Sequence, residues 1–135
     1  MGADQVVDRM GFKSNQLILE VGHRDDCDQE LRNSIKNRIG SDFIENTANE
    51  VVDAVIIWWR DEDGDLVDEL VDALTFLTED GPIWVLTPKV GRPGHVEASD
   101  IQDAAPTAGL SQTVSFPVGS NWTATKLVHR KGSKK

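Results

Sequence analysis

The sequence predicts an α/β fold in which helices cover both faces of a mostly parallel sheet. Short apolar runs alternate along the chain with segments of helical periodicity, as in strands joined by crossover helices. Residues 54–59 are apolar without interruption, so both faces of that strand need cover. With 135 residues, of which 39% are hydrophobic and 27% charged, the chain has the size and composition of one globular domain.

The chain is expected to begin its regular structure with a strand and a helix. Residues 16–21 form a short, mostly apolar run that ends at Gly22 and predicts a buried strand. A helix follows, because apolar side chains recur at every fourth position: Cys27, Leu31, Ile35 and Ile39. Asp25 or Asp28 is expected to cap this helix and Gly40 to end it.

The middle of the chain predicts the central strand and a second helix. Residues 43–44 predict a short strand, and residues 53–59 the strongest strand of the sequence. Residues 61–64 form a turn, and Asp65 is expected to cap a helix that Gly81 ends. The apolar face of this helix is predicted to hold Leu66, Val67, Leu70, Val71, Leu74 and Leu77.

A third strand and helix follow. Residues 82–86 are apolar after Pro82 and predict another buried strand. Ser99 with Gln102 three residues later has the pattern of a capping box for the next helix. Pro106 is expected to kink or end that helix.

The last two strands, around residues 110–116 and 122–129, alternate as an antiparallel pair does. The predicted fold is therefore a three-layer Rossmann-like sandwich. Its mostly parallel sheet has five or six strands and closes with a C-terminal antiparallel pair. One domain is expected over residues 1–130, followed by a basic tail at 131–135.

The charge is unevenly distributed. All 23 acidic residues precede residue 104, whereas five of the 14 basic residues follow it, within a net charge of −9. An acidic body repels phosphate backbones, so duplex nucleic acid is not an expected partner. The basic tail is interpreted as a solvated terminus, with contact to an anionic partner as the alternative.

The sequence also excludes two classes of protein. Cys27 is the only cysteine, which excludes a disulfide-stapled secreted scaffold. No run reaches the roughly 18 to 20 apolar residues of a membrane span, and residues 1–10 lack a signal-peptide pattern. We therefore expect a cytoplasmic protein with no membrane partner.

Several short motifs together resemble a small actinobacterial family of unknown function. They lie at residues 10–13, 58–61, 64–68, 86–89, 94–97 and 104–110. The resemblance covers nearly the whole chain, but it implies no activity.

A second resemblance, to class I methyltransferases that bind S-adenosylmethionine, concerns the order of elements from Asp53 onward. Residues 19–22, Leu-Glu-Val-Gly, resemble the first strand and the opening of the cofactor loop of that family. Bulky and acidic residues then occupy positions 23–28, where methyltransferases have small residues. The residues between Gly40 and the central strand are too few for all the strand–helix units of that family, so at least one unit is missing. Glu45 is the only candidate for the acidic residue that binds the ribose of the cofactor. We therefore expect a reduced relative that has lost its cofactor.

Ligands of open α/β sheets bind at the carboxyl ends of the strands, where three loops of this chain are predicted to meet. These loops supply six candidate residues for binding an anion or a partner: His23, Arg24, Arg60, Lys89, Arg92 and His95. The alternative is that these side chains pair with the carboxylates of the same loops. Arg60 is expected to project as a surface charge toward the segment 89–95, so that Arg60→Ala weakens binding at a folding cost of about 0 to 1 kcal/mol.

No catalytic or metal site is predicted. Cys27 is interpreted as a small core residue, and the three histidines lack the spacing of metal ligands. Residues 61–65 superficially match a calcium loop, but glycine stands at the fourth position instead of the sixth. We therefore expect a non-catalytic Rossmann-like binding or regulatory module whose partner is a protein or a small anionic ligand. The alternative is a small enzyme or a binder of nucleotide or S-adenosylmethionine with a modified pocket, and a homodimer remains open.

Overall fold

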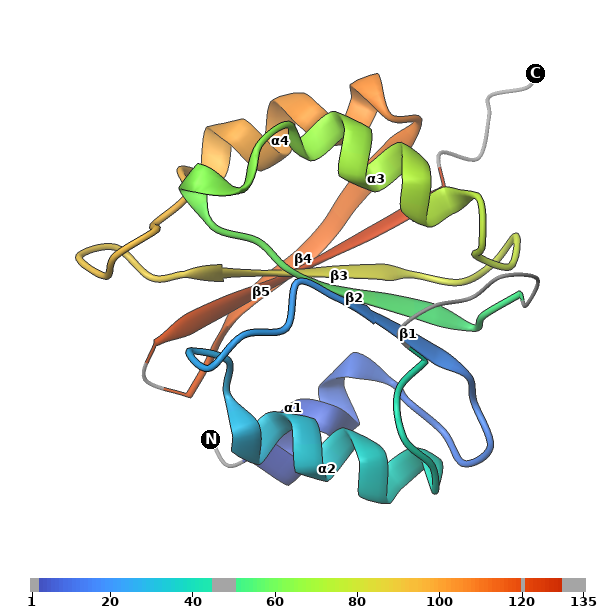
Figure 1. The fold of residues 1–135 in the computed structure, drawn as a ribbon. Helices are drawn as coiled ribbons and strands as arrows, with labels where there is room; N and C mark the ends of the chain where they lie inside the picture. The colour runs from blue at the N-terminus through green and yellow to red at the C-terminus, as the bar shows by residue number, and fades with distance from the viewer. Residues whose placement is uncertain (1–2, 45–50, 120, 130–135) are drawn as a thin grey trace.

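A computed structural model describes residues 3–44, 51–119 and 121–129. Helices lie on both sides of one sheet, which confirms the three-layer α/β sandwich (Figure 1). The elements follow in the order α1 (Ala3–Met10), β1 (Ile18–Val21), α2 (Gln29–Ile39), β2 (Ala54–Trp58), α3 (Leu66–Leu74), β3 (Ile83–Pro88), α4 (Ala98–Thr107), β4 (Leu110–Val118) and β5 (Trp122–His129). The proposed basic tail at 131–135 lies outside the described residues.

The sheet is mixed and has five strands in the order β1-β2-β3-β5-β4. β1, β2 and β3 are parallel neighbours, whereas β5 pairs antiparallel with both β3 and β4. The carboxyl ends of β1, β2 and β3 therefore lie at one edge, on the left in Figure 1. We call this the carboxyl edge.

α1 and α2 cover the lower face of the sheet in Figure 1. α2 confirms the predicted helix, with Asp28 as its N-cap and Gly40 in the left-handed conformation as its C-cap. Cys27 precedes this cap, so it is not part of the helical stripe, although it packs against the core. α1 was not predicted; it buries Val6, Val7 and Met10.

α3 and α4 cover the upper face (Figure 1). Asp65 caps α3 as predicted, but the helix ends at Leu74, so the expected continuation toward Gly81 is wrong. The capping box of α4 is also wrong, because that helix begins at Ala98 behind Glu97, whose side chain makes no capping hydrogen bond. Pro106 lies in the last turn of α4, in agreement with its predicted role as a terminator.

Each face of the sheet has its own apolar core. The side chain of Trp58 belongs to the lower core and that of Trp59 to the upper core, because successive residues of a strand face opposite ways. Trp84 and Trp122 lie in the lower core, so all four tryptophans are buried.

The predicted short strand at residues 43–44 is reduced to a single bridge from Ile44 to Leu19, beside β1. Glu45, the candidate ribose ligand, lies outside the described residues. In the described part of the chain, no helix combines the length and apolar character that a membrane crossing requires.

Candidate functional site

Three loops meet at the carboxyl edge: residues 22–28 after β1, 59–65 after β2, and 89–97 after β3. Direct bonds join them. The backbone N–H of Asp61 donates to the carbonyl of Gly94 at 2.9 Å, and Arg24 pairs with Asp63 at 2.7 Å. The expected meeting of the three loops is therefore present.

Arg60 is the central residue of this edge. Its guanidinium donates to the carbonyl oxygens of Gly22, at 2.8 Å, and of Trp58, at 3.1 Å. Its Nε lies 3.0 Å from Oδ2 of Asp26, and its Nη2 bonds the other carboxylate oxygen. The side chain thus bridges the ends of β1 and β2 and holds the loop between them.

Trp122 closes the lower side of this arrangement. The guanidinium carbon of Arg60 lies 5.4 Å from the centre of the Trp122 ring, within the range of a cation–π contact. The indole Nε1 of Trp122 donates to the backbone carbonyl of Asp26 at 3.1 Å. Both the loop and the guanidinium are therefore held from the β5 side.

The expectation for Arg60 was wrong in one respect. Only 2% of Arg60 is exposed, so it is a buried structural cation and not a surface charge. It lies at the predicted edge and its Cβ approaches Gly94, but its guanidinium turns toward β1. The buried position makes the expected folding cost of 0 to 1 kcal/mol too small, because that range applies to exposed charges.

The ion pair changes the acidity of its neighbours. Hydrogen bonding to Arg60 lowers the pKa of Asp26 below its ordinary value. Burial alone would lower the pKa of Arg60, but Asp26 raises it above its ordinary value. Burial raises the pKa of the Cys27 thiol, which opposes thiolate formation. Cys27 was expected to be a small core residue, but it is only half-buried and packs at the margin of the lower core.

A second ion pair, in which both side chains are buried, was not predicted. The Glu20 carboxylate on β1 accepts from Arg32 of α2, with distances of 2.6 and 2.8 Å, and from Trp58 Nε1 at 2.9 Å. The Glu20 side chain is fully buried. A charged residue inside an otherwise apolar strand, with an arginine on the next helix, was the available signal for this pair.

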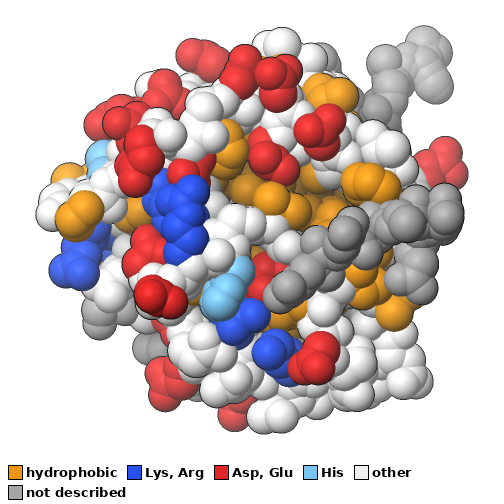
Figure 2. All heavy atoms as spheres, in the orientation of Figure 1, with side chains coloured by type: hydrophobic (Ala, Val, Ile, Leu, Met, Phe, Trp, Pro, Cys, Tyr) orange, Lys and Arg blue, Asp and Glu red, His pale blue; other side chains and the backbone are white. Residues whose placement is uncertain are grey.

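The remaining candidate residues do not form one cationic cluster. Lys89 Nζ donates to the carbonyl of Gly119 at 3.0 Å, and His95 Nδ1 lies 2.9 Å from the carbonyl of Pro88. His23 and Arg92 are exposed. Figure 2 shows Lys and Arg side chains among acidic groups on the left of this face, with further acidic groups above them. For Arg24 and Arg60, the alternative of pairing with local carboxylates is the one observed.

A hollow of about 420 Å³ opens at the carboxyl edge on the lower side, between loops 22–28 and 89–97. We call it the lower hollow. Its lining includes Asp26, Cys27, Arg92, Asn121 and Trp122. Of the six predicted residues, only Arg92 lines it directly, while Arg60 supports its wall through Asp26.

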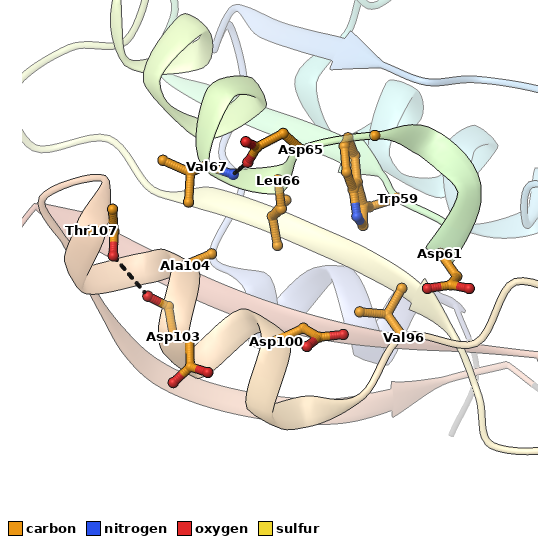
Figure 3. Close-up of a pocket in the computed structure, with 11 residues that line it drawn as sticks. Trp59, Asp61, Asp65, Leu66, Val67, Val96, Asp100, Asp103, Ala104 and Thr107 are labelled. Atoms are coloured by element: carbon orange, nitrogen blue, oxygen red, sulfur yellow. Dashed lines mark hydrogen bonds between the residues drawn. The ribbon is translucent and has the colours of Figure 1, made fainter.

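A groove of about 540 Å³ separates α3 from α4 (Figure 3). Trp59 and Leu66 provide apolar contacts, and four carboxylates lie along the groove: Asp61, Asp65, Asp100 and Asp103. The Asp65 carboxylate accepts from the Val67 N–H at 2.9 Å, as its capping role requires. Among the residues that the structure describes, no group of three or more His, Cys, Asp or Glu side chains has an arrangement that could hold a metal ion.

Comparison with known proteins identifies the family of this chain. A family model described as "Protein of unknown function (DUF3052)" matches residues 7–131. The chain belongs to the DUF3052 family. Uncharacterized proteins of Mycobacterium tuberculosis and Mycobacterium bovis are each 49% identical to it over 123 residues, covering 91% of this chain and 77% of theirs.

Solved methyltransferases share the fold of this DUF3052 chain. An S-adenosylmethionine-dependent methyltransferase from Aquifex aeolicus aligns with a TM-score of 0.61 at 14% identity, covering 93% of this chain and 88% of that protein. The glycopeptide N-methyltransferase MtfA aligns with a TM-score of 0.64 at 8% identity, covering 95% and 94%. The O-methyltransferase NcsB1 reaches a TM-score of 0.70 at 9% identity, over 96% of this chain and 54% of its own. At these identities the likeness concerns the fold alone.

Proposed function

We propose that this DUF3052 domain is a non-catalytic binding module that uses the carboxyl edge of a methyltransferase-like fold without transferring methyl groups. The observation that carries the proposal is the buried side chain of Arg60, which bonds the carbonyl oxygens at the ends of both β1 and β2.

The position of Arg60 matters because of the chain's topology. The connection after β1 passes below the sheet through α2, whereas the connection after β2 passes above it through α3 (Figure 1). Ligands of open α/β sheets bind where successive connections change sides in this way. In this chain the guanidinium and its Asp26 partner occupy that place.

The residues after β1 do not fit S-adenosylmethionine in the usual manner. A cofactor loop requires small residues so that its backbone can approach the ligand. Gly22 is the only glycine of the segment 22–28, and a Cβ there would overlap the carbonyl oxygen of Trp58. The absence of a side chain at Gly22 therefore allows its contact with β2, and Asp26, among the bulky residues that follow, bonds Arg60.

Titration with S-adenosylmethionine and S-adenosylhomocysteine tests the proposal. We expect no heat of binding in calorimetry and no change in melting temperature. A cofactor present at 100 times its Kd would stabilise the folded state by about 2.7 kcal/mol, which a thermal-shift assay detects readily. The proposal would be overturned if the cofactor stabilised the wild type and the exposed control Lys13→Met to the same extent but did not stabilise Arg92→Met.

The lower hollow favours one alternative, a nucleotide or S-adenosylmethionine site in a modified position. Arg92 is an exposed cation there, and Trp122 offers an aromatic surface beside it. However, Asp25 and Asp26 line the same hollow and oppose the binding of phosphates. ATP and ADP in the same thermal-shift assay separate this alternative from the main proposal.

The charges at the carboxyl edge indicate the chemistry of the partner. Because Arg24 and Arg60 are already paired, the exposed Arg92 and the half-buried Lys89 are the cations left for an acidic protein segment or a small anion. A homodimer is the further candidate, and sedimentation velocity at several protein concentrations distinguishes it from a monomer. The acidic surface of the upper face does not favour duplex nucleic acid.

A further inference from the structure

A second hollow at the carboxyl edge lies on the upper side of the sheet. It has a volume of about 510 Å³ and is enclosed by the loop after β3, the first turns of α4, and strands β4 and β5. We call it the β3–α4 hollow. Its size falls within the roughly 300 to 1,000 Å³ of small-molecule sites.

The floor of the β3–α4 hollow is polar, although the rest of the sheet face beside it is apolar. Every second residue of β3 faces upward, and Ile83 and Val85 in the upper core are followed by Thr87 in the hollow. On β5 the same alternation leads from Leu127 in the core to Thr125 in the hollow. Hydroxyl groups therefore replace aliphatic side chains where the sheet reaches the hollow. The floor also includes Gln112, Ser115 and Thr123.

Thr87 is the most informative residue of this floor. Only 3% of the residue is exposed, and its hydroxyl has no hydrogen-bond partner among the described residues. By contrast, the Thr125 hydroxyl lies 3.3 Å from that of Ser115. The Thr87 hydroxyl oxygen is not among the fully enclosed unpartnered atoms of the described residues, so a molecule in the hollow can reach it. The Thr87 hydroxyl is thus an open hydrogen-bonding position in the wall of a hollow.

The rim of the hollow favours a negative group. Lys89 lines it, with its Nζ bonded to the Gly119 carbonyl at 3.0 Å, and His95 is held by the bond of Nδ1 to Pro88, with its Nε2 3.5 Å from a Glu97 carboxylate oxygen. α4, ten residues long, begins there at Ala98, and no side chain of its N-cap residue Glu97 covers the first N–H groups. The single carboxylate of Glu97 lies at the same rim, so the site suits a monoanion better than a highly charged phosphate.

The remaining wall is apolar. Val96 and Ile101 are buried side chains that line the hollow between its rim and α4. Val90, 82% exposed, stands at the opening. A ligand that fits therefore has a compact apolar part as well as polar groups.

We propose that the β3–α4 hollow binds a small hydroxy- or oxo-carboxylic acid. Its carboxylate faces Lys89, His95 and the start of α4, and its hydroxyl or carbonyl group bonds Thr87. This inference rests on the proposed binding function of the carboxyl edge and names the class of its ligand. The site is separate from the ends of β1 and β2, where Arg60 lies.

Two-dimensional NMR of the ¹⁵N-labelled chain tests the site. The probes are 4-hydroxybenzoate, 2-hydroxyisovalerate and 2-oxoisovalerate, which are monoanions with an apolar part, each compared with its methyl ester, and inorganic phosphate serves as the anion control. We expect at least one acid to shift the amide signals of Thr87, Ala98 and Thr125 in a saturable manner, with its ester at least tenfold weaker.

Three variants complete the test. Thr87→Val, of the same shape, is expected to weaken binding about tenfold without lowering the melting temperature, whereas Thr87→Ser keeps the hydroxyl and the binding. Thr75→Val, on the exposed end of α3, is the control and leaves binding unchanged.

Three results would overturn this assignment: no saturable shift with any acid at 20 mM, equal shifts with phosphate, or unaltered affinity in Thr87→Val. A response to S-adenosylmethionine that leaves these three amides unmoved would contradict the proposed function alone. If none of the acids shifts these amide signals, the proposed site is contradicted but the proposed function is not.

Discussion

Arg60 and Asp26, which are 34 residues apart in the sequence, form an ion pair beyond the ends of β2 and β1. Arg60 Nε lies 3.0 Å from Asp26 Oδ2. The two partners differ in environment, because the Arg60 side chain is 2% exposed and that of Asp26 is 53% exposed. The pair therefore joins the interior to the surface at the carboxyl ends of β1 and β2. The same pair holds the loop after β1 in place.

Replacing Arg60 tests this structural role. Arg60→Met is expected to lower the free energy of unfolding by about 2 to 4 kcal/mol, because two backbone carbonyl groups lose a charged donor and become unpartnered. Urea denaturation measures the change. Arg92→Met removes an exposed arginine of the same edge and should stay within about 0.5 kcal/mol of wild type. Equal small effects for both variants would show that Arg60 is not a structural cation.

The burial of Arg60 shows which part of the candidate site could not be predicted from the sequence. The buried strands follow from apolar runs. Asp65 was recognised as a helix cap, and Asp28 as one of two candidates with Asp25, because the effect of a cap is local. An arginine after a strand has the pattern of a surface residue, and its partner Asp26 is recognisable only once β1 and β2 are adjacent. The helix α1 escaped prediction because its short stripe of apolar residues has no recognisable cap.

Gly22 offers a test of the close approach between the loop after β1 and β2. Gly22 and Gly91 both have positive φ, +82° and +87°, so alanine at either position pays the same cost of about 1 to 2 kcal/mol for the left-handed conformation. Only at Gly22 would the added Cβ overlap a neighbouring atom, the Trp58 carbonyl oxygen. We expect Gly22→Ala to be at least about 1 kcal/mol more destabilising than Gly91→Ala in urea denaturation. Similar values for the two variants would contradict the close approach.

The buried pair of Glu20 and Arg32 calls for a double-mutant cycle. Arg32→Met leaves a buried carboxylate without its cation and is expected to cost about 3 to 5 kcal/mol. Glu20→Gln keeps an acceptor for Trp58 Nε1 but leaves the buried guanidinium uncompensated, at a comparable cost.

The double variant Glu20→Gln with Arg32→Met removes both charges, so we expect it to be more stable than the sum of the single changes predicts, by at least about 1 kcal/mol. Additive effects would mean that the two side chains do not interact energetically. Chemical denaturation of the four proteins at pH 7 provides the comparison.

The Asp26 carboxylate gives the final prediction, which concerns pH. Because hydrogen bonding to Arg60 lowers its pKa in the folded protein below the ordinary value of 3.8, the folded state favours the charged carboxylate. The resulting stabilisation is fully present above pH 3.8 and is lost as the pH falls through the lower pKa of the folded state. Asp26→Asn lacks this contribution at every pH. The difference in unfolding free energy between wild type and Asp26→Asn should therefore stay constant from about pH 7 to pH 5 and shrink below pH 3.8. Asp25→Asn, at the exposed neighbouring position, is the matched control and should show a smaller difference throughout. A difference that grows on acidification would mean that burial, which raises the pKa of a carboxyl group, outweighs the bond to Arg60 at this position.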